Sequence, residues 1–269
     1  MINKRMKNRI FGLMGVVALF LFLIMSFENF GGFPLDDGWI HQTYARNLVE
    51  LGEWSFIPGT VSAGSTSPLW TLILALGYLI NLPPSAYIVL AGGLSLVIFG
   101  LLGKNLIEKL TGDQSWLVWL AGGVLLFDWR HVWAALSGME TLTYALVILL
   151  VFYLLFTLEQ NKAWHSILIG ITAGAAVWLR PEGITILGPI AWVLFFRDGI
   201  WQSKAKQFGL VLAGLFAALI PYAILNLQLA GTILPNTFSA KQTEYAILLE
   251  QPIFSRILRL GLQPLIGVG

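Results

Sequence analysis

The sequence contains no cysteine, only three histidines and few charged side chains; Asp, Glu, Lys and Arg make up 11% of its 269 residues. Without cysteine the chain has no disulfides, thiolate nucleophiles or cysteine-based metal sites. The three histidines are too scattered for a histidine-rich metal cluster. No run of about five like charges occurs, so we expect no nucleic-acid partner.

The abundant residues are apolar. Hydrophobic residues make up 57% of the chain and the mean hydropathy is +0.77, whereas a soluble domain has about 25% charged residues. The apolar stretches are continuous and do not alternate, which argues against a transmembrane β-barrel. The 17 Phe, 11 Trp and 7 Tyr are typical of aromatic belts at membrane surfaces. At about 20 residues per span, the sequence predicts an all-α polytopic membrane bundle of about seven or eight transmembrane helices.

The N-terminus indicates on which side of the membrane the chain starts. Four basic residues precede an apolar run from residue 10 to 25, and no small-residue cleavage site follows that run. We therefore expect a retained span with its basic N-terminus in the cytoplasm. The first external loop then covers about residues 28–83.

Residues 67–82 form an apolar segment that is short for a span, since about fifteen helical residues reach about 22 Å, against a hydrocarbon core of roughly 30 Å. If the segment lies along the external surface as an interfacial helix, the later loops satisfy the positive-inside rule; if it crosses, they violate it. We therefore expect it to lie flat. The remaining spans are then expected at residues 84–103, 116–127, 141–158, 166–179, 183–196 and 208–225.

The first external loop contains an acidic pair, Asp36 and Asp37, at the start of an expected amphipathic helix that stops at Gly52. Either carboxylate can cap that helix. Beside a membrane surface the low dielectric can also raise the pKa of a carboxyl, so that it serves as a general base. A divalent metal ion between this pair and a phosphate is a further option that the sequence leaves open.

Other features of the loop have structural interpretations. Ser67 is expected to cap the interfacial helix, with Pro68 in its first position. The Gly/Ser/Thr run before Ser67 is either a connecting turn or a loop that presents N–H groups and hydroxyls to a phosphate or sugar. Arg46 and Glu50 have the spacing of an ion pair on one helix face.

Further ionisable residues gather at the ends of later spans on the same predicted side. They occur in segments 128–131, 137–141, 180–183 and 234–241. Singly, each could be a loop or snorkelling charge, but ionisable residues that converge at membrane depth indicate function. A mixture of carboxylates with Arg, His and Lys suits a site that activates a hydroxyl and binds a phosphate.

Six blocks in this order resemble the GT-C superfamily of integral-membrane glycosyltransferases and are most similar to its bacterial arabinofuranosyltransferase-like branch. The blocks are residues 36–37, 44–48, 66–70, 137–141, 180–183 and 234–237. The resemblance implies transfer of a sugar from a polyprenyl-phosphate carrier to a glycan, lipid or protein on the external face of the bacterial inner membrane. It also implies that residues 1–269 form one GT-C-like catalytic module of a longer chain, since the sequence stops within an apolar segment.

The resemblance further implies an in-line displacement with inversion at the anomeric carbon and no cofactor besides the open metal ion. Asp36 or Asp37 would remove the proton from the acceptor hydroxyl, and cations would receive the charge of the leaving phosphate. The expected phosphate-binding residues are Arg180 first, then Arg130, His131 and Lys241. The expected substrate-binding residues are Tyr44, Ser67, Trp70, Glu140, Glu182 and Asn236.

Two other classes of protein combine many spans with charges in the membrane. A transporter or lipid flippase favours ionisable or Gly/Pro-broken positions near the bilayer midplane and often an inverted repeat, whereas here the charges cluster at predicted span ends. The other class is a non-catalytic, truncated remnant that keeps the scaffold without turning over. Single replacement of Asp36 and Asp37 by Asn distinguishes the enzyme from both classes, because only an enzyme would lose sugar transfer from a polyprenyl-phosphate donor.

Overall fold

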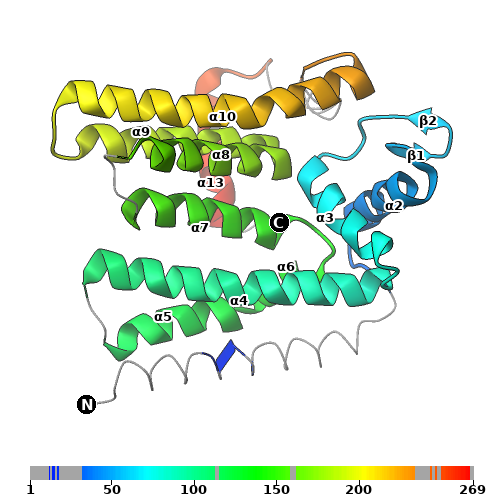
Figure 1. The fold of residues 1–269 in the computed structure, drawn as a ribbon, viewed down its shortest axis with the longest axis horizontal. Helices are drawn as coiled ribbons and strands as arrows, with labels where there is room; N and C mark the ends of the chain where they lie inside the picture. Colours follow the sequence, from blue (N-terminus) through cyan, green and yellow to red (C-terminus); the bar gives the residue numbers. More distant parts are fainter. Residues whose placement is uncertain are drawn as a thin grey trace.

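The chain folds almost entirely into helices (Figure 1). The computed structural model describes residues 32–112, 115–157, 162–233 and 250–266, together with the isolated positions 12, 14, 15, 17, 243 and 246. Apart from one two-stranded hairpin, every regular element in these residues is a helix. The all-α class predicted from composition is confirmed. The retained span predicted for residues 10–25 falls almost wholly outside the described residues.

In the described residues, the segment predicted to be the first external loop begins with the predicted helix, α2 (Asp36–Leu51). This helix ends where expected because Gly52 adopts a left-handed conformation, with φ of 72°, and its N–H bonds back to the carbonyl of Asn47. A glycine has no Cβ and reaches this conformation without strain. The sequence signal for the end of the helix was therefore sufficient.

A short antiparallel hairpin follows, made of β1 (Ser55–Ile57) and β2 (Thr60–Val61), and it is not among the predicted elements. Gly59 in its turn has φ of 80° and comes directly after Pro58. A Pro-Gly pair is a common turn signal. The strands themselves are too short to show an alternating pattern, which is why the hairpin could not be inferred.

Helix α3 (Pro68–Leu79) covers most of the short apolar segment of the loop. Its 12 residues reach about 18 Å, which is too short to cross a hydrocarbon core of roughly 30 Å. This length agrees with an interfacial helix. The orientation of α3 to the bilayer stays a prediction.

Two helices are long and apolar enough to cross a membrane: α4 (Pro84–Thr111), with 28 residues, and α10 (Trp201–Ala230), with 30. Helices α6 (Trp129–Leu136) and α7 (Thr141–Thr157) reach that length only as a pair, which bends by 117° at the break between them. The described residues thus hold two candidate spans, or three with the bent pair. These helices are consistent with a membrane protein, whereas the predicted seven or eight spans are not confirmed.

The other helices are shorter. They are α5 (Trp116–Phe127), α8 (Ala163–Leu179), the 3-10 helix η1 (Pro181–Ile186), α9 (Leu187–Phe196) and α13 (Ile253–Ile266). The 17 residues of α8 reach about 26 Å. The prediction of seven or eight spans treats each apolar run except residues 67–82 as a crossing, whereas in the described residues only α4 and α10 reach that length as single helices.

The helices form layers, with the elements of the predicted first external loop at one end (Figure 1). Helices α4 and α5 lie on one side, α8, α9 and α10 on the other, and α7 lies between them. One hydrophobic cluster joins α4 to α5, α6 and α7, and a second joins α7 to α8, α9 and α10. A third cluster joins α2 and α3 to Ile88 at the start of α4 and Leu179 at the end of α8. This third cluster holds the loop against the end of the bundle where α8 stops.

Glycines allow α8 and α10 to pack closely. A Cβ on Gly170 would lie 2.0 Å from the carbonyl oxygen of Val211, and a Cβ on Gly214 would lie 2.2 Å from that of Ile167. Both clashes are with backbone atoms, which cannot move aside as a flexible side chain can. Small residues at such contacts let helix backbones approach each other.

We expect Gly214→Ala to destabilise the protein by about 1–3 kcal/mol, since the new methyl group would overlap the backbone of α8. Gly209→Ala is the matched control on the same helix, because a Cβ there meets nothing within 4 Å and alanine favours the helix. Thermal unfolding of the two purified variants in detergent measures the difference. Equal melting temperatures would contradict the close packing of α8 on α10.

Candidate functional site

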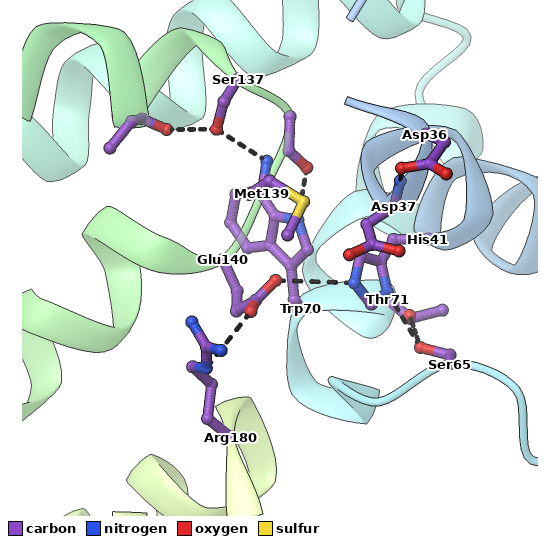
Figure 2. A network of polar contacts seen from close by, with 12 residues as sticks. Asp36, Asp37, His41, Ser65, Trp70, Thr71, Ser137, Met139, Glu140 and Arg180 are labelled. Carbon is purple, nitrogen blue, oxygen red and sulfur yellow. Dashed lines mark hydrogen bonds and ion pairs between the residues drawn. The ribbon is translucent and has the colours of Figure 1, made fainter. Parts of the chain in front are cut away.

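Segments that are far apart in the sequence meet at the end of the bundle beside α2 (Figure 2). His41 lies on α2, Glu140 lies in the break between α6 and α7, and Arg180 lies where α8 ends and η1 begins. Ser65 and Thr71 adjoin them from the loop before α3 and from α3 itself. We call these five residues the Glu140 network.

Glu140 is 3% exposed, and each of its oxygens lies near a partner. Oε1 is 3.7 Å from Nε of Arg180, and Oε2 is 3.5 Å from Nε2 of His41. Both distances exceed the range of about 2.7–3.2 Å for N–H···O hydrogen bonds, and within the described residues Oε2 has no hydrogen-bond partner. The carboxylate is therefore held mainly by electrostatic attraction.

The pKa of the Glu140 carboxyl is lowered from its ordinary value of 4.5. Burial is the largest influence and favours the neutral acid, but three others together outweigh it: the contact with His41, the backbone N–H of Glu140 and the positive charge of Arg180. The site therefore holds an ionised carboxylate in a place that is largely closed to water.

His41 is 2% exposed and connects Glu140 to a pair of hydroxyls. Its Nδ1 lies 3.0 Å from Oγ of Ser65, and that oxygen lies 2.7 Å from Oγ1 of Thr71. Because each hydroxyl can donate or accept, the pair can satisfy Nδ1 with or without a proton. The ring is thereby held on both sides, by Glu140 at Nε2 and by Ser65 at Nδ1.

The turn that carries Glu140 is held by hydrogen bonds. Oγ of Ser137 donates to a carbonyl of α6 at 2.8 Å and accepts the N–H of Met139 at 3.2 Å. Gly138 has φ of 78°, where glycine is favoured, and its carbonyl accepts the Nε1–H of Trp70 at 2.9 Å. Trp70, predicted to bind substrate, is thus a buried link between α3 and this turn.

Arg180 is the partly exposed member of the network, with 38% of its side chain accessible. Its backbone is extended, with φ of −151° and ψ of 130°, because Pro181 follows it. Its Nε lies 3.7 Å from Glu140 and 3.9 Å from Glu182. Both of these ion-pair distances are to Nε, and the guanidinium carbon lies 6.0 Å from the centre of the Tyr144 ring. The partly exposed guanidinium can bind an anion.

The acidic pair is exposed in the first turn of α2 (Figure 2). Leu35 takes the N-cap position and no side chain caps the helix there, so the expected cap by Asp36 or Asp37 is not formed. Carboxylates in a first turn instead interact favourably with the helix dipole. Oδ1 of Asp36 accepts the N–H of Asp37 at 3.0 Å. Asp37 comes four residues before His41, a spacing that puts the two on one helix face.

Tyr44 and Ser67, two further predicted substrate-binding residues, are buried in the loop. The hydroxyl of Tyr44 lies 2.6 Å from Oγ of Ser62 and accepts the N–H of Gly64 at 3.0 Å. Ser67 occupies the N-cap position of α3, as predicted, but its side chain makes no cap hydrogen bond. The Gly/Ser/Thr run is therefore a packed connection at these positions, and substrate contact by Tyr44, Ser67 and Trp70 stays a prediction.

Two predicted phosphate-binding residues, Arg130 and His131, lie at the start of α6 with local contacts of their own. Arg130 is exposed, and its N–H bonds to Oδ1 of Asp128. Nδ1 of His131 lies 3.0 Å from the carbonyl oxygen of Leu125, and its ring packs against Phe99. The contacts that the structure describes do not bring either residue to the Glu140 network.

The remaining predicted residues divide into three cases. Glu182 is exposed and lies beside Arg180. Lys241 and Asn236 lie outside the described residues. The predicted pairing of Arg46 with Glu50 is confirmed, at 4.0 Å between Nε and Oε2.

Sequence reasoning did not single out His41, Ser65 or Thr71. One signal could have found His41: it stands four residues after Asp37 in a predicted helix, so both lie on one face. Ser65 and Thr71 offer no such signal, because only the folded loop brings their hydroxyls together.

The described residues include no group of three or more His, Asp or Glu side chains placed to hold a metal ion. A metal ion between Asp36 and Asp37 would need further ligands from the substrate. Dependence on a divalent metal stays an open prediction.

Comparisons with known proteins find no relative. The chain matches no protein-family model, no curated protein and no solved structure. The resemblance to the GT-C superfamily therefore depends on the six sequence blocks alone.

We expect Glu140→Gln to destabilise the protein by roughly 1.5–3 kcal/mol at neutral pH, because it removes the charge that attracts Arg180 and His41. The folded-state pKa lies below the ordinary 4.5, so this stabilisation is complete above about pH 4.5 and is lost as the pH falls through the lowered pKa. The melting temperatures of the wild type and the variant should therefore converge in acid. A difference that does not change with pH would contradict an ionised Glu140.

Proposed function

We propose that the chain is a membrane glycosyltransferase of the GT-C type, which moves a sugar from a polyprenyl phosphate to an acceptor with inversion at the anomeric carbon. The observation that carries this proposal is the arrangement around Glu140, with an exposed acidic pair on one side and a partly exposed arginine on the other (Figure 2). A hydroxyl nucleophile needs a base, and a phosphate leaving group needs a cation.

We assign the general base to Asp37. Asp36 already accepts the N–H of Asp37, whereas Asp37 shares a helix face with His41. In the reaction, the acceptor oxygen bonds to the anomeric carbon while the bond from that carbon to the phosphate oxygen breaks. The proton of the acceptor hydroxyl goes to the Asp37 carboxylate, and the electron pair of the broken bond leaves with the phosphate.

Arg180 is the proposed ligand of the donor phosphate. Its two Nη groups can make the parallel N–H···O contacts by which arginine binds phosphate, and Glu140 holds its Nε. A fixed cation stabilises the charge that develops on the leaving phosphate. Because a phosphate is already a weak base, the reaction needs no general acid.

An apolar groove of about 410 Å³ is the proposed site for the prenyl chain. It begins beside Trp178, two residues before Arg180, and opens between the first external loop and α10. Farnesyl phosphate added from water loses the contact between its hydrocarbon chain and water on entering such a groove, which favours its binding. The groove is lined by Leu48, Trp54, Leu72, Trp178, Pro221, Ile224, Leu225 and Gln228.

The proposal places the protein in the bacterial inner membrane, as a multi-pass protein with a cytoplasmic N-terminus and its site on the external face. Two helices of sufficient length support the membrane setting. The basic N-terminus and the positive-inside rule support the orientation. Its partners would be the polyprenyl-phosphate sugar, the acceptor and the surrounding lipid.

A flippase for the same lipid-linked sugar is the second candidate. The observation that favours it is the 117° bend between α6 and α7 with a buried charge in the break, since broken helices with ionisable groups are typical of transporters. A flippase needs no general base. Loss of the Asp37 carboxylate should therefore abolish transfer by an enzyme and leave lipid translocation unchanged.

We expect Asp37→Asn to lower sugar transfer by about 100-fold or more, the typical contribution of a general base. Asp36→Asn should lower it by about tenfold or less, because its carboxylate acts on the helix backbone. The measurement is release of farnesyl phosphate from farnesyl-phosphoryl arabinofuranose in membranes that contain the product of the complete gene. Glu50→Gln, which removes an exposed charge from the same helix, is the control. Full activity of both aspartate variants would exclude the acidic pair as the base.

We expect Leu225→Trp to weaken binding of farnesyl phosphate by about tenfold, because the ring would fill the groove and displace several buried CH₂ groups. Leu227→Trp adds the same ring to an exposed position of α10 and is the control. Titration of the purified variants with farnesyl phosphate gives both affinities. Equal affinities would show that the prenyl chain binds elsewhere.

A further inference from the structure

We infer that His41 and Glu140 are positioning residues, which set the place of Arg180 relative to Asp37. This inference rests on the proposed function, because it assigns these two residues to the base and the phosphate ligand of the same reaction. Neither His41 nor Glu140 needs to touch the substrate. Their effect is on the geometry of the groups that do.

The first observation is that one carboxylate faces both helices that carry the reacting groups. Oε2 of Glu140 faces His41 on α2, one helical turn after Asp37, and Oε1 faces Arg180 at the end of α8. In the residues that the structure describes, no other ion pair connects these two helices. An in-line displacement requires the attacking and leaving oxygens on opposite sides of the anomeric carbon, so the separation of base and phosphate ligand matters.

The second observation is the burial of this bridge. Both Glu140 and His41 are almost fully buried, at 3% and 2% exposure. A buried ion pair often adds no net stability over apolar residues of similar volume, so folding alone gives no strong reason to keep a charged group here. A function for this buried pair that fits the geometry is to fix the distance between Asp37 and Arg180.

The third observation is that His41 is itself held. Ser65 and Thr71 fix the ring from the Nδ1 side, and their hydroxyls can reverse direction to suit either state of that nitrogen. The Nε2 atom therefore keeps its position toward Glu140. In turn, Glu140 faces Nε of Arg180 at 3.7 Å, and 38% of the arginine side chain is accessible to a ligand.

The test compares two substitutions of His41, each of which keeps the contact of only one of its two ring nitrogens. The amide nitrogen of a glutamine reaches about where Nε2 lies, so His41→Gln keeps the contact with Glu140. The shorter side chain in His41→Asn reaches about where Nδ1 lies, so it keeps the contact with Ser65 and loses Glu140. We expect His41→Asn to weaken the binding of farnesyl phosphate by about tenfold, as for loss of a charge-assisted contact, and His41→Gln to stay within about threefold of the wild type.

The same variants should differ in catalysis. The kcat for transfer from farnesyl-phosphoryl arabinofuranose should fall in His41→Asn and be largely restored in His41→Gln. A merely structural role predicts equal losses in both, accompanied by equal drops in melting temperature. If His41→Asn and His41→Gln lose the same fraction of kcat while their melting temperatures stay unchanged, the inference is also wrong.

Glu140→Asp provides a second test that does not depend on the folding of the histidine variants. It keeps the charge but shortens the side chain by one CH₂, so it cannot reach His41 and Arg180 together. We expect the same loss of farnesyl phosphate affinity as in His41→Asn, and wild-type affinity would contradict the inference. Glu50→Gln is the matched control for an exposed ion pair on α2, where little change is expected.

Failure of the proposed function has a different signature from failure of this inference. If the wild-type protein does not bind farnesyl phosphate, or binds it equally well after Arg180→Gln, the proposed phosphate site is wrong and the inference falls with it. If the wild type binds and Arg180→Gln does not, but the variants of His41 and Glu140 bind normally, only the positioning role is wrong.

Discussion

A buried carboxylate needs compensating charge within reach, and the arrangement of this protein follows from that requirement at Glu140. Losing the charge of this carboxylate is expected to cost roughly 1.5–3 kcal/mol. Its partners, His41 and Arg180, come from α2 and from the end of α8. The carboxylate is therefore stable only when the segment that carries α2 is docked on the other helices. The apolar cluster of α2, α3 and the end of α8 stabilises the same docking, so charge and packing select one arrangement.

The break between α6 and α7 imposes a second requirement. Buried backbone N–H and C=O groups outside a helix need hydrogen-bond partners. Here α3 supplies one, since Trp70 donates to the carbonyl of Gly138. The 117° bend also frees Glu140 from either helix, so that its side chain can face two other segments.

Sequence signals within one helix predicted local structure well. Contacts between segments that are distant in the sequence could not be predicted. The end of α2 at Gly52 and the pairing of Arg46 with Glu50 each depend on residues within one helix, and both were predicted. His41 and Ser65 are in contact although they lie 24 positions apart, and no helix or strand periodicity in the sequence indicates such a contact. The predicted number of spans is not confirmed, because hydropathy identifies apolar runs but does not show where a helix bends or ends.

The positions of the motifs argue that they serve one site. Polar residues that merely end a span should be satisfied where they stand, as His131 is by the carbonyl of Leu125. Glu140 and Arg180 come from motifs 40 positions apart and instead find their partners in each other and in α2. Convergence of this kind costs conformational freedom and places charge where water is scarce. Replacement of a buried ion pair by apolar residues of similar volume is often neutral or stabilising, so stability alone does not account for this convergence.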